Sequence, residues 1–279
     1  MALRYPAVAD QFYPGEPTSL RESIEECFLH RLGPGKKPPS TGDLGKVIGL
    51  VSPHAGYMYS GPVAAHGYYA ISFLKNVRLI VIIGPNHWGL GSGVAVYPSG
   101  AWITPLGRVE VDKDAAEQLL KSSDIVDFDE LAHRNEHSIE VQIPFLQYTF
   151  PKGFKILPIC MALQDKLTSV EVGEALADVI KGKDALLIAS SDFTHYESQE
   201  SAFKKDSEAI KAICDLDVDR FYTVIRKMDI STCGHGPIAV LMTVAKKLNV
   251  AKGTLLKYAT SGDITGDFSA VVGYASIIL

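Results

Sequence analysis

Three apolar runs, each typical of a buried β-strand, are followed within a few residues by a histidine. The runs and their histidines are 47–51 with His54, 79–83 with His87 and 185–189 with His195. Ligands of open α/β sheets bind beyond the carboxyl ends of the strands, and neighbouring strands lie about 4.8 Å apart. Since neutral imidazole is a common ligand of transition metals, His54 and His87 are predicted metal ligands. The alternative is that each ring bonds the backbone of its own turn.

Asp192 and His195 form a second pair, separated by Phe193 and Thr194. A carboxylate three residues before a histidine can orient the imidazole as a general acid or base. The alternative is an Asx turn beside a surface histidine. Because the pair follows a buried strand, we predict that Asp192 and His195 are catalytic and that Asp192 orients the His195 ring.

Cys233 differs from the other three cysteines because glycines lie close to it and Pro237 marks the start of a predicted helix. A thiol near a helix N-terminus is favoured as thiolate. Cys233 could be a metal ligand, a nucleophile or a redox-sensitive thiol. Cys27, Cys160 and Cys214 are better explained as small buried apolar residues. The absence of a CxxC pair indicates reduced thiols.

Residues 133–137 match the H-x-x-E-H signature of inverted zinc peptidases. The segment is polar and lacks helical periodicity, so we reject that interpretation and retain only His137 as a pocket residue. Asn86, beside His87, is predicted to form hydrogen bonds in the same pocket. The sequence has no P-loop, G-x-G-x-x-G or G-x-S-x-G motif, so we predict no nucleotide cofactor.

Strands alternate with helices along the chain, which predicts an α/β fold with a mostly parallel central sheet and helices on both faces. We expect one three-layer domain over residues 1–279. The strand from residue 79 is expected to stop at Gly84 and Pro85. Pro62 is expected in the first turn of a helix, and Thr18 or Ser19 is expected to cap an earlier helix. Residues 33–45 are expected to form an exposed loop, and residues 89–107 a loop and hairpin.

The composition is that of a soluble globular protein, with 47% hydrophobic residues and a formal net charge of −5. The modest negative charge argues against non-specific nucleic-acid binding. No apolar run approaches the roughly 18 residues of a membrane span, and no signal peptide is recognisable. We therefore expect a cytoplasmic protein.

Motifs along the whole sequence resemble those of the Memo family. The opening segment Pro6 to Tyr13 fits this pattern too. The other motifs are Pro53-His54-Ala55-Gly56-Tyr57, Gly84-Pro85-Asn86-His87, Glu136-His137-Ser138-Ile139-Glu140, Ser191-Asp192-Phe193-Thr194-His195-Tyr196, Thr232-Cys233-Gly234 and Thr260-Ser261-Gly262-Asp263.

This resemblance implies a fold similar to that of class III extradiol dioxygenases. It places the family's metal ligands on His54, His87 and Cys233, and its acidic and histidine pocket residues on Asp192 and His195. It also implies a link to iron or copper, to redox chemistry and cell migration in animal members, and to a radical-SAM protein in prokaryotic ones (the AmmeMemoRadiSam grouping).

Cys233 departs from the two-histidine, one-carboxylate ligand set of nonheme iron oxygenases, because thiolate favours copper(I), zinc or an altered iron site. Three functions follow as hypotheses. The first is a metal-dependent redox enzyme of the dioxygenase type, with iron(II) or copper favoured and zinc as the alternative. The second is a non-catalytic module that binds a peptide or small ligand, with Tyr57, Trp88 and Tyr196 along its cleft. The third is metal-assisted hydrolysis.

Overall fold

The computed structural model describes residues 2–39 and 47–279, so part of the loop predicted at 33–45 lies outside the described residues. The helices are α1 Pro17–Leu29, α2 Tyr57–Ile71, α3 Lys113–Ser122, the 3-10 helix η1 Leu131–His133, α4 Gln142–Thr149, α5 Lys166–Ile180, α6 Gln199–Cys214, α7 Val218–Met228, α8 His235–Lys247 and α9 Gly262–Thr265. The strands are β1 Leu3–Arg4, β2 Gly49–Ser52, β3 Leu79–Pro85, β4 Val94–Val96, β5 Ala101–Thr104, β6 Gly107–Glu110, β7 Asp127–Phe128, β8 Lys155–Met161, β9 Ala185–Ser190, β10 His195–Glu197, β11 Thr254–Thr260 and β12 Val271–Ile278.

The central sheet has the strand order β10-β12-β2-β9-β3-β8-β4-β7, and β11 pairs with β12. Its centre, β2-β9-β3-β8, is parallel, whereas β12 and β4 run antiparallel to the strands next to them. A small second sheet, β1-β5-β6, contains a hairpin of β5 and β6, which extends to Glu110 and so beyond the range 89–107 predicted for a loop and hairpin. The parallel centre was predicted, but the antiparallel strands on both flanks were not.

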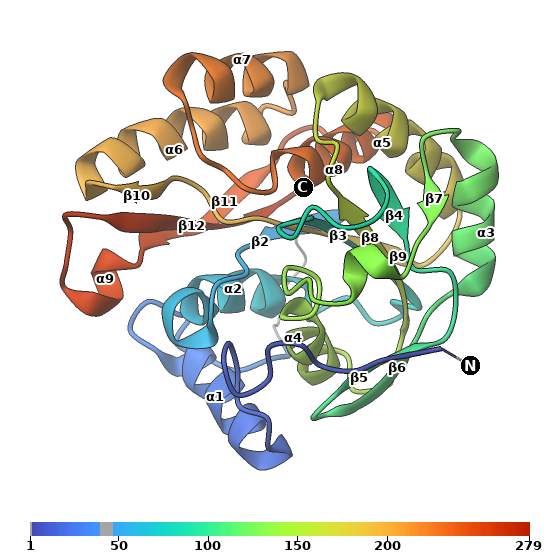
Figure 1. Ribbon diagram of the computed structural model, residues 1–279. Coiled ribbons are helices and arrows are strands. Elements are labelled where there is room, and N and C mark those ends of the chain that lie inside the picture. Colours follow the sequence, from blue (N-terminus) through green and yellow to red (C-terminus); the bar gives the residue numbers. More distant parts are fainter. Residues whose placement is uncertain (1, 40–46) are drawn as a thin grey trace.

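Helices cover both faces of the central sheet (Figure 1). Helices α1, α2 and α4 pack on one face around a core that includes Leu50, Ile80 and Ile82, while α3 and α5 to α8 cover the other face. Successive side chains of a central strand enter the two cores in turn. This explains why these strands are apolar throughout. The predicted α/β class with helices on both faces is confirmed. Among residues 2–39 and 47–279, no helix has the length and apolar character needed to cross a bilayer.

The carboxyl ends of β2, β9 and β3 lie along one edge of the sheet because these strands are parallel. Strand β3 does not stop before Gly84 as predicted; it continues to Pro85, which is paired with Met161 of β8. Proline is tolerated at this end position because its missing N–H would be needed only further inside a ladder. Gly84 is required by packing, since a Cβ there would lie 2.3 Å from the Ser138 hydroxyl oxygen.

Two predicted helix starts are wrong. Helix α1 is capped by Glu16, whose carboxylate accepts the N–H of Ser19 at 2.8 Å, and Pro17 takes the first helical position that its fixed φ favours. Helix α2 begins at Tyr57, so Pro62 lies inside the helix. The hydrogen bond that Pro62 cannot make would reach the carbonyl of Met58, a residue exposed to solvent.

A buried ion pair between Arg4 and Glu140 ties the N-terminal segment to the loop before α4. The Glu140 carboxylate also accepts the N–H groups of Ala7 and Val8 at 2.9 and 3.1 Å and the hydroxyl of Tyr13. The Arg4 guanidinium donates as well to the main-chain oxygens of His133 and Glu136 at 3.1 and 2.7 Å. This network fixes the path of residues 133–140.

We expect Glu140→Gln to lower the free energy of unfolding by about 3 kcal/mol, because it leaves the buried guanidinium of Arg4 without its counter-charge. The matched control is Glu110→Gln, which breaks an exposed glutamate–arginine pair with Arg108 and should cost about 1 kcal/mol or less. Urea unfolding followed by circular dichroism measures both changes. Equal destabilisation by the two substitutions would contradict a structural role for the buried pair.

Candidate metal centre

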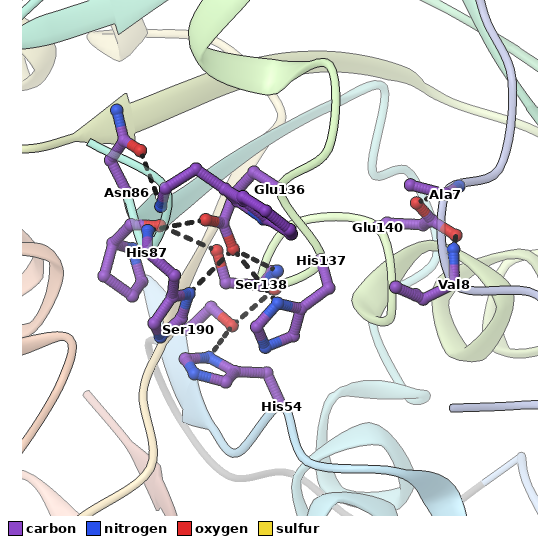
Figure 2. Close-up of polar contacts among 12 residues, drawn as sticks. Ala7, Val8, His54, Asn86, His87, Glu136, His137, Ser138, Glu140 and Ser190 are labelled. Atoms are coloured by element: carbon purple, nitrogen blue, oxygen red, sulfur yellow. Dashed lines mark hydrogen bonds and ion pairs between the residues drawn. The ribbon is translucent and has the colours of Figure 1, made fainter. Parts of the chain in front are cut away.

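His54, His87 and Cys233 come together at the carboxyl edge of the sheet, as a group of side chains that could hold a metal ion. Their candidate ligand atoms all lie within 4.8 Å of one another. His54 follows β2, His87 follows β3, and Cys233 lies two residues before α8. The Cys233 Sγ is 3.1 Å from His54 Nε2, and the two imidazole rings lie edge to face, 5.2 Å apart. Figure 2 shows His54 and His87 beside each other.

Ser190, at the end of β9, orients the His54 ring. Its hydroxyl donates its one proton to the main-chain oxygen of Ser138 at 2.6 Å and accepts from the Gln142 amide at 2.8 Å. His54 Nδ1, 2.8 Å from the same hydroxyl, must therefore be the donor in that contact. The proton on Nδ1 leaves the lone pair of Nε2 directed at Cys233.

His54 is kept neutral by its surroundings. Burial, followed by the positive charges of His137, His87 and His195, holds the pKa of His54 well below its ordinary value. A neutral imidazole with a free Nε2 lone pair is the form that binds a transition metal.

Glu136 orients the His87 ring, as Ser190 orients the His54 ring. Its buried carboxylate receives the His87 N–H at 2.7 Å and lies 2.9 Å from His87 Nδ1, which leaves Nε2 as the free ring nitrogen. Burial raises the pKa of Glu136, but the hydrogen bond and charge of His87, the charge of His137 and the N–H of Ser138 outweigh it and bring the pKa to about 2. An ionised Glu136 also makes the His87 ring a better electron donor.

The thiol of Cys233 lies in a partly buried position between His54 and Asp192. It accepts the main-chain N–H of Asp192 at 3.3 Å. Burial and the nearby Asp192 carboxylate raise the pKa of Cys233, so the expected thiolate at the start of α8 is not favoured in the metal-free protein. A metal ion held by Cys233 would offset this effect, because metal coordination favours the thiolate form of a cysteine ligand.

Asp192 and His195 lie at the same edge, but Asp192 does not orient the His195 ring as predicted. Asp192 accepts the main-chain N–H of His54 at 2.8 Å, while His195 Nδ1 bonds the main-chain oxygen of Ser231 at 3.0 Å. Burial raises the pKa of Asp192 to about 6, against the opposing effect of the His54 N–H and the charges of His195 and His87. The two residues between them are held by another strand, because the N–H of Phe193 donates to the main-chain oxygen of Gly273 at 2.9 Å.

His137 lies against the candidate ligands, whereas Asn86 turns away from them. The His137 ring stacks on His87 at 4.6 Å and meets His54 edge to face at 5.4 Å. Burial outweighs the opposing charge of Glu136 and lowers the pKa of His137 to about 4. The Asn86 side chain instead bonds the backbone of residues 88–90, donating to the Leu90 oxygen at 2.7 Å. Asn86 thus shapes the loop after β3 and is not the pocket hydrogen-bonder we predicted.

The three aromatic residues expected along a cleft differ in position. Tyr57 is buried and its hydroxyl donates to the Val141 oxygen at 2.7 Å, so it belongs to the core. Trp88 and Tyr196 are exposed, each adjacent in sequence to a histidine of the site.

Sequence reasoning missed the residues that hold the imidazoles, namely Ser190, Glu136 and Gln142. A usable signal was present for Glu136, since it belongs to the H-x-x-E-H match that we set aside. That match is not a helical zinc motif: His133 ends η1 and its Nε2 bonds the Ala95 oxygen at 3.1 Å, away from the candidate ligands.

The sequence is similar to known proteins over nearly its whole length. The sequence matches the Memo-like protein family over residues 4–278. It is 49% identical over 277 residues to a MEMO1 family protein of Methanopyrus kandleri, covering 99% of this chain and 98% of the relative. It is 51% identical over 281 residues to a MEMO1 family protein of Methanosarcina mazei, covering 100% of both chains.

The structure is also similar to that of an uncharacterized protein from Escherichia coli K12. The TM-score is 0.53 at 13% sequence identity, with 84% of this chain and 100% of that chain covered. At this identity the similarity concerns the fold alone. The match to the family over nearly the whole length shows that the chain belongs to the Memo family.

Proposed function

We propose that this Memo family protein is a metal-dependent redox protein whose ion is held by His54, His87 and Cys233. The observation that carries the proposal is the state of the two imidazoles: each has Nδ1 engaged, by Ser190 or Glu136, and the Nε2 of His54 faces the Cys233 sulfur at 3.1 Å. Imidazole nitrogen and thiolate suit iron and copper, and the softness of thiolate keeps zinc as the alternative. Iron or copper held by these residues would supply electron transfer and Lewis acidity.

His195 is the proposed general base of the site. In its neutral form Nδ1 donates to the Ser231 oxygen, since a carbonyl can only accept, so Nε2 is free to take a proton. The Asp192 carboxylate, beside the Cys233 thiol and the His54 backbone, is the proposed second proton-exchanging group. A substrate hydroxyl near both groups could thus lose its proton to Nε2 of His195.

The proposed substrate is a small molecule or peptide. We also propose a functional link between this protein and a radical-SAM protein. Exposed Trp88 and Tyr196, 59% and 79% accessible, offer contact surface beside His87 and His195. The same surface favours a second candidate function, a binding module without catalysis. Oxygen consumption distinguishes the redox enzyme from the binding module, because only the enzyme would consume oxygen.

Metal content tests the ligand set directly. Protein purified without an affinity tag should contain iron or copper, and His54→Ala, His87→Ala and Cys233→Ala should each remove most of it, because three ligands leave little redundancy. His30→Gln and Cys214→Ser, which change the same residue types elsewhere, should retain it. Elemental analysis by mass spectrometry gives the stoichiometry. Unchanged metal in all three ligand variants would contradict the proposal, and zinc as the native metal would redirect it toward hydrolysis.

Glu136→Gln tests the role of the buried carboxylate behind His87. The amide keeps the size of the side chain but lacks its charge, so we expect metal affinity to fall about tenfold or more. Competition with a chelator of known affinity measures the change. Glu110→Gln on the surface is the control and should bind metal as the unaltered protein does. Wild-type affinity in Glu136→Gln would show that orientation of His87 does not depend on this charge.

Oxygen uptake on a panel of catechols tests catalysis. We expect turnover by the metal-loaded protein, reduced about 100-fold or more in His195→Ala, which is the usual contribution of a general base. The variant should keep its metal because His195 is not a proposed ligand, and that measurement serves as the control. Absence of turnover across the panel, with full metal content, would favour the binding module.

A further inference from the structure

A cavity separate from the metal centre lies between the start of α6, the end of β11 and α9. Its volume is about 550 Å³, which is within the range of small-molecule sites. It includes residues of the Thr260-Ser261-Gly262-Asp263 motif, which the metal centre does not use. Figure 1 shows α9 at the connection between β11 and β12, with β10 leading into the nearby end of α6.

Three aromatic rings form walls of this cavity, from Phe203, Tyr258 and Phe268. Phe203 and Phe268 are 58% and 49% exposed, so a ligand in the cavity can reach both rings. The Tyr258 ring meets Phe203 at 5.9 Å in an edge-to-face arrangement. Tyr258 is also held in place, because its hydroxyl donates to the buried carboxylate of Asp206 at 2.7 Å. The cavity therefore has at least one rigid aromatic wall.

Two carboxylates, from Glu200 and Asp263, also line the cavity, together with Gln199, Ala259 and Thr260. Neither takes part in an ion pair within residues 2–39 and 47–279. Arg31 donates to the main-chain oxygen of Asp263, and the Asp263 carboxylate accepts from Thr260. Lys257 precedes Tyr258 on β11, and alternate side chains of a strand point to opposite faces. The cavity is thus lined by two carboxylates and three aromatic side chains, with the Arg31 guanidinium bonded to the main chain of Asp263.

We propose that this cavity binds a small organic cation that carries a quaternary or methylated ammonium group. Aromatic faces attract such a cation through the ring quadrupole, and the methyl groups favour the apolar walls. The carboxylates of Glu200 and Asp263 supply the counter-charge. In the described part of the chain, neither carboxylate belongs to a group of three or more side chains that could hold a metal ion. The proposal does not depend on the function of the metal centre.

Choline and 3,3-dimethylbutan-1-ol form a matched pair of probes, because they have the same shape but only choline is charged. Saturation-transfer NMR on the ligand methyl protons measures binding to the full-length protein. We expect choline to bind about tenfold more tightly than the neutral probe, equivalent to about 1.4 kcal/mol. Phe203→Leu and Glu200→Gln should each weaken choline binding about threefold or more, since each removes one interaction with the cation.

Two control substitutions repeat the same chemical changes elsewhere on the surface. Phe128→Leu and Glu22→Gln replace an exposed phenylalanine of β7 and an exposed glutamate of α1, and they should leave choline binding unchanged. Circular dichroism verifies that each variant is folded. Equal binding of the two probes would overturn the proposal and indicate a cavity for an apolar group, such as the side chain of a partner protein. Lack of saturable choline binding, or equal losses in the control variants, would overturn it too.

Discussion

The buried ion pair of Arg4 and Glu140 is the constraint on which the candidate site depends. Glu140 is held by the N-terminal segment, and Arg4 holds the main-chain oxygens of His133 and Glu136. The loop between η1 and α4 has no regular secondary structure to fix it, so these contacts determine its path. The same loop supplies Glu136, which orients His87. Two segments more than 130 residues apart in sequence therefore hold one side of the site together.

The other side of the site depends on the parallel centre of the sheet. Ser52 is paired with Ser190 across β2 and β9, which brings the residues following both strands to the same edge. The hydroxyl of Ser190 then fixes the tautomer of His54. The two candidate imidazole ligands are thus oriented by different means, one by a neutral hydroxyl and one by a carboxylate. An imidazole backed by a carboxylate is the stronger electron donor, so His87 and His54 would bind a metal unequally.

The sequence predicted the strands and the residues that follow them because both signals are local. Short apolar runs that end at turn residues favour buried strands, and histidines just beyond such strands lie at one edge of the sheet if the strands are parallel. The same reasoning was wrong for Asn86 and for the orientation of His195. In both cases the decisive partner is a backbone group, of Leu90 or of Ser231, and no side-chain pattern reveals it.

The sequence by itself determined the α/β class and the parallel strands. Through its resemblance to the Memo family it also indicated His54, His87 and Cys233 as candidate metal ligands. Only the tertiary structure decided which nitrogen of each imidazole is free, because that depends on Ser190 and Glu136, residues distant in sequence from the rings they contact. It also decided the surroundings of Cys233, where burial and the Asp192 carboxylate raise the pKa of the thiol although the residue lies just before a helix. Hydrogen-bond partners and burial are long-range properties, whereas periodicity and turn residues are local ones.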